Sequence, residues 1–210
     1  MQSYLSRENE LRIALVGEAS VGKTAISLRF AGNGFTKNLS LTVGLDLFNK
    51  TLNILGKQVN VVVRDTAGQE QYRSIVKNFY RNCQAIIIVF ALGNLDPTVP
   101  LAKESFNTIG EWYRQIKNNA DEGTMIALCG NMNDLQLEIT HDEVMEKIRT
   151  IDENLEYFET SAKTNDGIDA MFETIAEKFL KSNEKENIDP IPDLNLNHTP
   201  NNNSKRGFIC

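Results

Sequence analysis

Residues 17–24 constrain the fold of this chain more than any other run, because they match a phosphate-binding pattern in a defined structural context. The run reads Gly-Glu-Ala-Ser-Val-Gly-Lys-Thr and follows an apolar stretch, residues 11–16, that predicts a strand. Glycines let the backbone curl so that successive N–H groups point at phosphate oxygens, and a helix beginning after Gly22 adds the positive end of its dipole. We therefore expect Lys23 to contact the β- and γ-phosphates of a nucleotide and the Thr24 hydroxyl to bind Mg²⁺. This motif does not distinguish ATP from GTP.

Strand-like and helical segments alternate along the chain, which predicts an α/β fold. Apolar, β-branched runs predict strands at residues 11–16, 58–63, 85–91, 125–129 and 155–158. Apolar residues at helical spacing predict helices over residues 106–116 and 168–179, and Thr140 with Glu143 predicts a capping box at the start of another. The run 45–54, followed by the turn residues Leu55-Gly56-Lys57, predicts a hairpin that would add one antiparallel edge strand to an otherwise parallel sheet.

Composition narrows the class of protein. The 210 residues, 41% of them hydrophobic, can bury the core of one domain, and the net charge of −6 without a block of Lys and Arg argues against a nucleic-acid partner. Cys83, Cys129 and Cys210 are widely spaced and form no metal-binding pattern, which fits a reducing compartment. The N-terminus lacks the apolar stretch of a signal peptide, and the longest apolar run, 85–92, is too short to span a bilayer. We expect a cytosolic protein.

Two further motifs predict which base is bound. Residues 131–134 read Asn-Met-Asn-Asp and residues 159–163 read Glu-Thr-Ser-Ala-Lys, and each run follows a predicted strand. Open α/β sheets bind ligands at the carboxyl ends of their strands. An ionised Asp134 carboxylate accepts hydrogen bonds only, so it can receive those of guanine N1–H and the N2 amine, which adenine does not offer. The Ala162 backbone N–H could donate to guanine O6. Taken alone, each loop also fits an ordinary polar connection.

Together these motifs resemble those of a known family. The phosphate loop, Thr42, the run Asp65-Thr66-Ala67-Gly68-Gln69-Glu70, the run 131–134 and Ser161-Ala162-Lys163 resemble the five conserved elements of Ras-superfamily small GTPases. The resemblance covers residues 9–181, and the runs 42–46 and 69–73 are most similar to the Rab branch, which acts in vesicle and membrane traffic. It implies a P-loop GTPase domain whose six-stranded sheet is mostly parallel, with one antiparallel edge strand and helices on both faces.

The resemblance also implies roles for single residues. Gln69 would be catalytic, orienting the water that attacks GTP, while Gly68 N–H would contact the γ-phosphate. The ligands of Mg²⁺ would be Thr24, Thr42 and Asp65, the last through water. Phe35 matches an aromatic that packs on guanine, although a core or hairpin aromatic also fits. The residues expected around GTP or GDP are Ala19, Ser20, Val21, Gly22, Lys23, Thr24, Ala25, Phe35, Thr42, Gly68, Asn131, Asp134, Ser161, Ala162 and Lys163.

Hydrolysis in such a family removes the phosphate that orders two segments, and partners read the difference. The resemblance implies an exchange factor, a GTPase-activating protein and effectors that contact residues 36–48 and 64–80. Leu47 and Arg64 stand where Rab proteins usually carry phenylalanine and tryptophan, so we expect an altered effector surface.

Two departures concern the nucleotide itself. Met132 stands where lysine is usual, and the ammonium that would bond the phosphate loop is absent, so we expect weaker or faster-exchanging guanine binding. Ala19 places a methyl group near the γ-phosphate, so we expect intrinsic hydrolysis to be slow and to depend on an activating protein.

Residues 182–210 are rich in Asn and contain Pro190, Pro192 and Pro200, which predicts a disordered hypervariable tail; a docked segment at 188–196 is the alternative. The tail ends in Cys210 without the residues of a Cys-a-a-X signal, so Cys210 is either a prenyl acceptor or an unmodified thiol. A single lipid chain anchors reversibly. We expect a monomer that cycles between the cytosol and the cytosolic face of endomembranes.

Three functions remain open on sequence. The first is a GTPase that switches between GTP and GDP and recruits effectors. The second, which Ala19 and Met132 keep open, is a guanine-nucleotide-binding module with little intrinsic hydrolysis. The third, an ATP-using phosphotransferase, is disfavoured by Asp134 and by residues 161–163.

Overall fold

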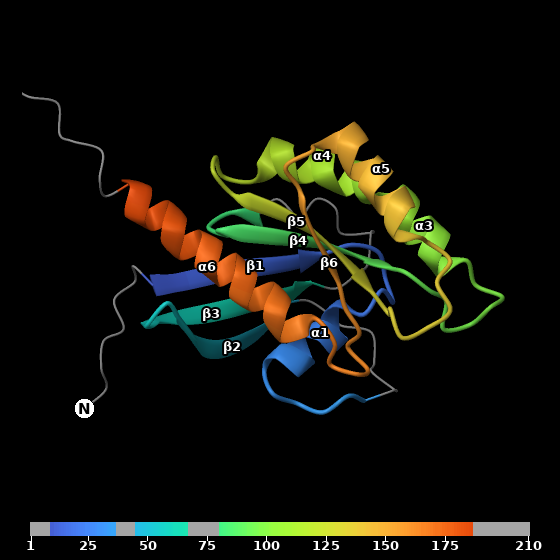
Figure 1. Ribbon diagram of the computed structural model, residues 1–210, viewed down its shortest axis with the longest axis horizontal. Helices are drawn as coiled ribbons and strands as arrows, with labels where there is room; N and C mark the ends of the chain where they lie inside the picture. The colour runs from blue at the N-terminus through green and yellow to red at the C-terminus, as the bar shows by residue number, and fades with distance from the viewer. Residues whose placement is uncertain (1–8, 37–44, 67–79, 187–210) are drawn as a thin grey trace, which may run out of the picture.

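One six-stranded sheet organises the protein in the computed structural model, which describes residues 9–36, 45–66 and 80–186 (Figure 1). Its strands are β1 (Glu10–Val16), β2 (Leu45–Ile54), β3 (Lys57–Thr66), β4 (Ala85–Ala91), β5 (Met125–Asn131) and β6 (Glu156–Glu159). They lie in the order β2-β3-β1-β4-β5-β6, and every neighbouring pair is parallel except β2 with β3. The predicted sheet, mostly parallel with one antiparallel edge strand, is confirmed.

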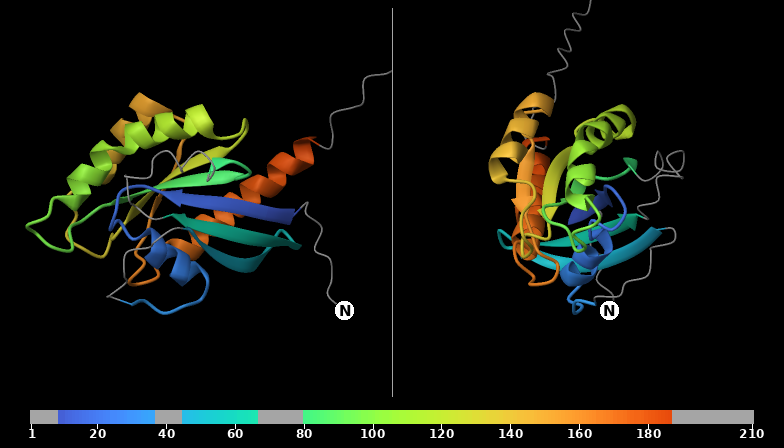
Figure 2. Two further views of the ribbon diagram at one scale, coloured as in Figure 1. Left: turned by 180° about the vertical axis from the view of Figure 1, so that it is seen from behind. Right: turned by 90° about the vertical axis from the view of Figure 1, so that its right-hand side faces the viewer.

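Helices cover both faces of the sheet, as predicted (Figure 2). They are α1 (Lys23–Phe30), α3 (Leu101–Asn107), α4 (Ile109–Asn119), α5 (His141–Ile151) and α6 (Ile168–Glu186). In β4, Ile87 and Val89 belong to the core under α1 and α6, whereas Ile86 and Ile88 belong to the core under α3, α4 and α5. Because strand side chains alternate between faces, the unbroken apolar sequence of β4 suits a strand that is buried on both.

The predicted hairpin forms the edge of the sheet. Leu55 and Gly56 at its tip have φ angles of 52° and 79°, and positive φ at both positions is what a tight hairpin turn requires. The resulting register places Leu47 directly opposite Arg64. The two positions that differ from the usual Rab aromatics are therefore cross-strand neighbours.

Two helices differ from their sequence-based predictions. The helix predicted over residues 106–116 is divided at Thr108, whose Oγ1 donates to the Ser105 carbonyl at 3.0 Å, and such side-chain bonds compete with the helical ladder. Helix α6 continues to Glu186, beyond the predicted domain end at residue 181. Near that end Lys57 Nζ lies 2.7 Å from Glu184 Oε1, so an ion pair joins α6 to the edge hairpin.

The capping box predicted from Thr140 and Glu143 is present at the start of α5. The Glu143 N–H donates to Thr140 Oγ1 at 3.3 Å, and the Thr140 N–H donates to Glu143 Oε2 at 2.8 Å. Two backbone donors at the helix start are thereby satisfied, which fixes where α5 begins after the loop that follows β5.

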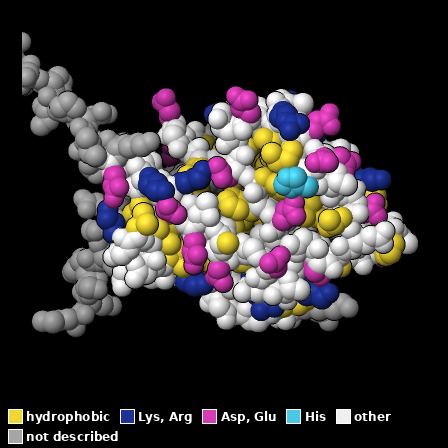
Figure 3. All heavy atoms as spheres, in the orientation of Figure 1, with side chains coloured by type: hydrophobic (Ala, Val, Ile, Leu, Met, Phe, Trp, Pro, Cys, Tyr) yellow, Lys and Arg dark blue, Asp and Glu magenta, His cyan; other side chains and the backbone are white. Residues whose placement is uncertain are grey.

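The surface mixes charges of both signs. On the face drawn in Figure 3, Lys and Arg side chains alternate with Asp and Glu rather than gathering in one block. That face therefore lacks the basic patch that a phosphate backbone requires. Within the described part of the chain, no helix has both the length and the apolar character needed to cross a bilayer.

Candidate nucleotide-binding site

The loop between β1 and α1 is packed so closely that two of its positions accept only glycine. At Gly17, where φ is 131°, an added Cβ would lie 2.1 Å from the Val89 carbonyl oxygen. At Gly22, where φ is 95°, it would lie 2.3 Å from Asn131 Nδ2. Positive φ and these close approaches both exclude a side chain. The first and last glycines of the predicted phosphate loop are therefore fixed by β4 and by the end of β5.

Lys23 lies folded back over this loop. Its Nζ donates to the carbonyl oxygens of Gly17 at 2.8 Å and of Glu18 at 2.6 Å, and the residue is only 5% exposed. Burial lowers the pKa of Lys23 to about 8, although the carboxylates of Asp65 and Glu18 act in the opposite direction. The loop thus holds a buried amino group at the place where the motif requires a contact to phosphate oxygens.

Thr24 and Asp65 meet beside the loop, one from the first turn of α1 and the other from near the end of β3. Thr24 Oγ1 donates to Asp65 Oδ2 at 2.6 Å, and Asp65 is fully buried. Hydroxyl and carboxylate oxygens are the ligands that Mg²⁺ prefers. This pair of side chains fits the metal ion that accompanies GTP and GDP. The third predicted ligand, Thr42, lies outside the described residues.

Asn131 connects the phosphate loop to the loop that follows β6. Its Nδ2 donates to the Val21 carbonyl at 2.9 Å, and its Oδ1 accepts the Ala162 N–H at 3.1 Å and the Thr160 hydroxyl at 3.2 Å. Asn131 is 1% exposed, so these bonds form away from water. The Ala162 N–H that was expected to reach guanine O6 is bonded to Asn131 here, so the two acceptors would have to share it.

Asp134 is presented as an ionised acceptor. Its Oδ1 accepts the Ser161 hydroxyl at 2.7 Å, and its Oδ2 accepts Lys163 Nζ at 3.0 Å. Partial burial opposes ionisation, but these two hydrogen bonds outweigh it and hold the pKa of Asp134 below its ordinary value. The carboxylate is therefore charged at neutral pH, as acceptance from guanine N1–H and the N2 amine requires.

Met132 packs against the phosphate loop. The residue is 9% exposed, adopts a φ of 68°, and places its terminal methyl 3.7 Å from where a Cβ on Gly22 would lie. A thioether contributes contact area here but has no hydrogen to donate. The residue that lacks the charged donor expected from the family therefore lies beside Gly22 of the phosphate loop.

Two positioning side chains were not singled out from the sequence. Arg29, near the end of α1, donates from Nε to the Ala162 carbonyl and from a terminal nitrogen to the Lys163 carbonyl, both at 2.7 Å. Thr160 bonds Asn131 on one side and Cys129 Sγ, at 3.2 Å, on the other. Thr160 stands in the run 159–163, where a signal existed. The partners of Arg29 are more than 130 residues away, and no local pattern indicates them.

Some of the remaining predicted residues lie in the described part of the chain, and the others lie outside it. Phe35 is 40% exposed, which excludes the core aromatic that the sequence also allowed. Ala25 faces the core, so only its backbone is available to a ligand, whereas Ser20 is exposed at a φ of 64°. Thr42, Gly68, Gln69 and Cys210 lie outside the described residues and stay predictions.

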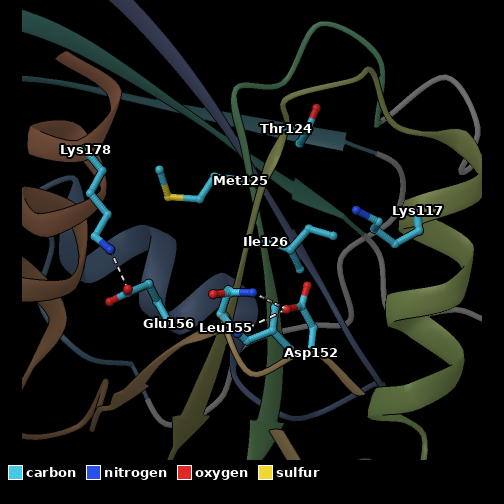
Figure 4. A pocket seen from close by; sticks show the side chains of 9 residues that line it. Lys117, Thr124, Met125, Ile126, Asp152, Leu155, Glu156 and Lys178 are labelled. Atoms are coloured by element: carbon cyan, nitrogen blue, oxygen red, sulfur yellow. Dashed lines mark hydrogen bonds and ion pairs between the residues drawn. The ribbon is translucent and has the colours of Figure 1, made fainter. Parts of the chain in front are cut away.

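A separate cavity lies at the opposite end of the sheet. It measures about 240 Å³ and is bordered by the amino ends of β5 and β6, with Lys117, Asp152 and the ion pair of Lys178 with Glu156 around it (Figure 4). It contains none of the residues expected to bind nucleotide, which gather at the carboxyl ends of the strands. A nucleotide site at the carboxyl ends of the strands agrees with the general rule for ligand binding by open α/β sheets.

A glycine-dependent phosphate loop, the Thr24–Asp65 oxygen pair and an ionised Asp134 together define a guanine-nucleotide-binding P-loop protein. The family model described as "Ras family" matches residues 12–181. The chain is 32% identical to RabJ of Dictyostelium discoideum over 182 residues, which cover 87% of this chain and 68% of that protein. It is 33% identical to Rab-18 of Lymnaea stagnalis over 174 residues (82% and 81%), and 35% identical to Rab-3 of Caenorhabditis elegans over 168 residues (79% and 72%).

The chain belongs to the Ras family, as a divergent Rab-like small GTPase. It is accordingly a GTP/GDP switch that binds Mg²⁺, hydrolyses GTP to GDP, and works with exchange factors, activating proteins and effectors. Of the functions left open by the sequence, the switch is the one that the relatives support.

Proposed function

We propose that this switch operates at the cytosolic face of endomembranes and holds its nucleotide through residues 17–24, Asp65, 131–134 and 160–163. The endomembrane location is proposed from the Rab relatives. The observation that carries the nucleotide-binding part of the proposal is the position of Asn131. Its side-chain amide bonds Val21 in the phosphate loop and Ala162 in the loop that follows β6, so the sites for base and phosphates form one unit. A polar loop with an unrelated role would not need that connection.

Each side chain has a definite task in this proposal. Lys23 transfers its hydrogen bonds from the loop carbonyls to the β- and γ-phosphates, and Asp134 accepts from guanine N1–H and the N2 amine. Thr24 and Asp65 hold Mg²⁺, which when bound offsets negative charge on the phosphates. Gln69 orients the attacking water. Once the γ-phosphate is gone, Thr42 and Gly68 lose a partner, and the segments that effectors contact are released.

Replacing Gln69 tests the hydrolytic part of the proposal. We expect Gln69→Leu to slow single-turnover GTP hydrolysis by about 10-fold or more, because leucine cannot orient water, while GDP affinity stays near the wild-type value. Gln58→Leu on the exposed edge hairpin is the matched control and should hydrolyse at the wild-type rate. Equal rates for Gln69→Leu and wild type would instead indicate a nucleotide-binding module that scarcely hydrolyses GTP.

Restoring lysine at position 132 tests the role of the missing donor. The Met132 methyl lies 3.7 Å from where a Cβ on Gly22 would stand, so the side chain is directed at the phosphate loop and a lysine ammonium in its place is expected to reach the loop carbonyls. We expect Met132→Lys to slow GDP dissociation by about 10-fold or more, the effect of one charge-assisted hydrogen bond. Met132→Leu, which adds no donor, should dissociate GDP at close to the wild-type rate. If Met132→Lys released GDP no more slowly than Met132→Leu, position 132 would not control exchange.

Effector choice is proposed to depend on the edge hairpin. Leu47 is 58% exposed, and the guanidinium of Arg64 opposite it donates to the Arg81 carbonyl at 3.1 Å. The surface therefore presents an aliphatic side chain beside a tethered cation, in place of two aromatic rings. Effectors of this protein are expected to differ from those that recognise an aromatic pair.

Membrane attachment is proposed to use a prenyl group on Cys210, in the tail that follows the GTPase domain, whose last helix α6 ends at Glu186 rather than at the predicted boundary of residue 181. The protein would act as a monomer, and one lipid chain would let it return to the cytosol. Intact-mass measurement on protein isolated from its own cells should show a prenyl adduct that disappears in Cys210→Ser. An unmodified Cys210 throughout would exclude this anchor.

A further inference from the structure

The chain's single tryptophan reaches the phosphate loop from another part of the fold. Trp112, on α4, donates its indole N–H to Glu18 Oε1 at 3.1 Å. Glu18 directly follows the first glycine of the loop, 94 residues earlier in the chain. Both residues are almost completely buried, with exposed fractions of 9% for Glu18 and 8% for Trp112. A buried carboxylate requires hydrogen-bond donors, and the indole supplies one.

Glu18 is consequently held at two points. Its carbonyl accepts Lys23 Nζ at 2.6 Å, and its carboxylate is drawn toward α4 by Trp112. The backbone beside it cannot shift toward β4, because Gly17 already lies against the Val89 carbonyl. Lys23 therefore holds the backbone of Glu18, and Trp112 holds its side chain. Together they fix the orientation of the first half of the loop.

The second half of the loop has its own external anchor, the bond from Asn131 Nδ2 to the Val21 carbonyl. Within the ranges that the structure describes, Asn131 and Trp112 are the side chains outside the loop and α1 that donate hydrogen bonds to residues 17–22. Met132 adds contact area but no donor. With that donor absent, the indole bond carries a larger share of the loop's support.

We propose that Trp112 is a positioning residue for phosphate binding, which acts through the Glu18 carboxylate and so couples helix α4 to the retention of nucleotide. Removal of the indole N–H leaves the carboxylate without this partner, next to a site that must accept a polyanion. The loop then loses its preorganised shape, and nucleotide leaves faster. Because Trp112 belongs to α4, a displacement of that helix would change how firmly the loop holds its nucleotide.

A double-mutant cycle tests the coupling. We expect Trp112→Phe and Glu18→Ala each to speed the release of fluorescently labelled GDP by about 10-fold, and the double variant to be no faster than either single one, because both remove the same bond. Glu18→Gln keeps an oxygen acceptor and should restore release to within about threefold of wild type. Multiplying effects in the double variant would show that the two residues act independently and would overturn the proposal.

Tyr113→Phe provides the matched control for a general loss of stability. It removes a hydrogen bond from the same helix to another carboxylate, that of Asp152 at 2.8 Å, at the end of the sheet away from the phosphate loop. Thermal unfolding of each variant is measured alongside release. We expect Tyr113→Phe to lower the unfolding temperature without changing GDP release. If Tyr113→Phe accelerated release as much as Trp112→Phe, the effect would be one of helix stability and the proposal would be wrong.

Discussion

Replacing Asp134 by asparagine is expected to lower affinity for GDP by about 1,000-fold or more, since a site built to accept hydrogen bonds from its ligand discriminates strongly when the acceptor is lost. The present carboxylate is ionised and held by Ser161 and Lys163. An asparagine amide would turn an N–H group toward the N–H groups of guanine, leaving donors on both sides without acceptors.

The same substitution predicts a change of base preference that a folding defect could not produce. Xanthine carries a carbonyl where guanine carries the N2 amine, so the introduced side-chain amide can donate to it. Binding of GDP, XDP and ADP to wild type and Asp134→Asn should show GDP affinity lost and the preference shifted toward XDP. Asp166→Asn is the control, because it makes the same chemical change at a nearby carboxylate that is not expected to contact the base. Asp166 accepts a hydrogen bond from the side chain of Asn133 at 2.8 Å. Undiminished GDP binding by Asp134→Asn would remove Asp134 from the base site.

Lys23→Met is expected to weaken GDP binding by about 100-fold or more, because methionine keeps the length of the side chain but loses every charge-assisted bond to phosphate. In the structure Lys23 is buried and bonded to the loop carbonyls. A lysine elsewhere on the surface could reach this position only if the loop rearranged. The loss should fall on the phosphates, leaving the discrimination between GDP and ADP intact.

The measurement for Lys23→Met is GDP and ADP affinity together with cooperative unfolding of the nucleotide-free protein. Lys57→Met serves as control, since Lys57 is exposed on the edge hairpin, where it pairs with Glu184 of α6. Wild-type GDP affinity in a folded Lys23→Met protein would contradict the assignment of residues 17–24 as the phosphate site.

The sheet was largely predictable because each strand carries its own local signal. The unbroken apolar run of β4 and the Leu55-Gly56 turn identify their elements from neighbouring residues alone. The extent of α6 was not predictable in this way. Its last turn is polar and does not continue the apolar stripe of residues 168–179, and its ion pair with Lys57 joins residues 127 positions apart. The division at Thr108 likewise interrupts a continuous apolar pattern, and a side-chain bond to the Ser105 carbonyl accompanies it.

The site shows the same contrast. Residues 17–24 and Asp134 were identified because their chemistry is written in contiguous motifs. Arg29 and Trp112 could not be, since each acts on a loop far away in the chain, and only the fold brings them there. Gln69 and Thr42 remain predictions from the family resemblance, as both lie outside the described residues.

The most direct test of a guanine-nucleotide switch is to identify the nucleotide that the purified protein carries and prefers. Protein isolated with Mg²⁺ is denatured, the released nucleotide is separated by ion-exchange chromatography, and the emptied protein is titrated with GDP and ADP. We predict GDP or GTP in the released fraction and a preference for GDP over ADP of about 1,000-fold or more, set by the acceptor at Asp134. Bound ATP or ADP, or equal affinity for the two diphosphates, would contradict the account.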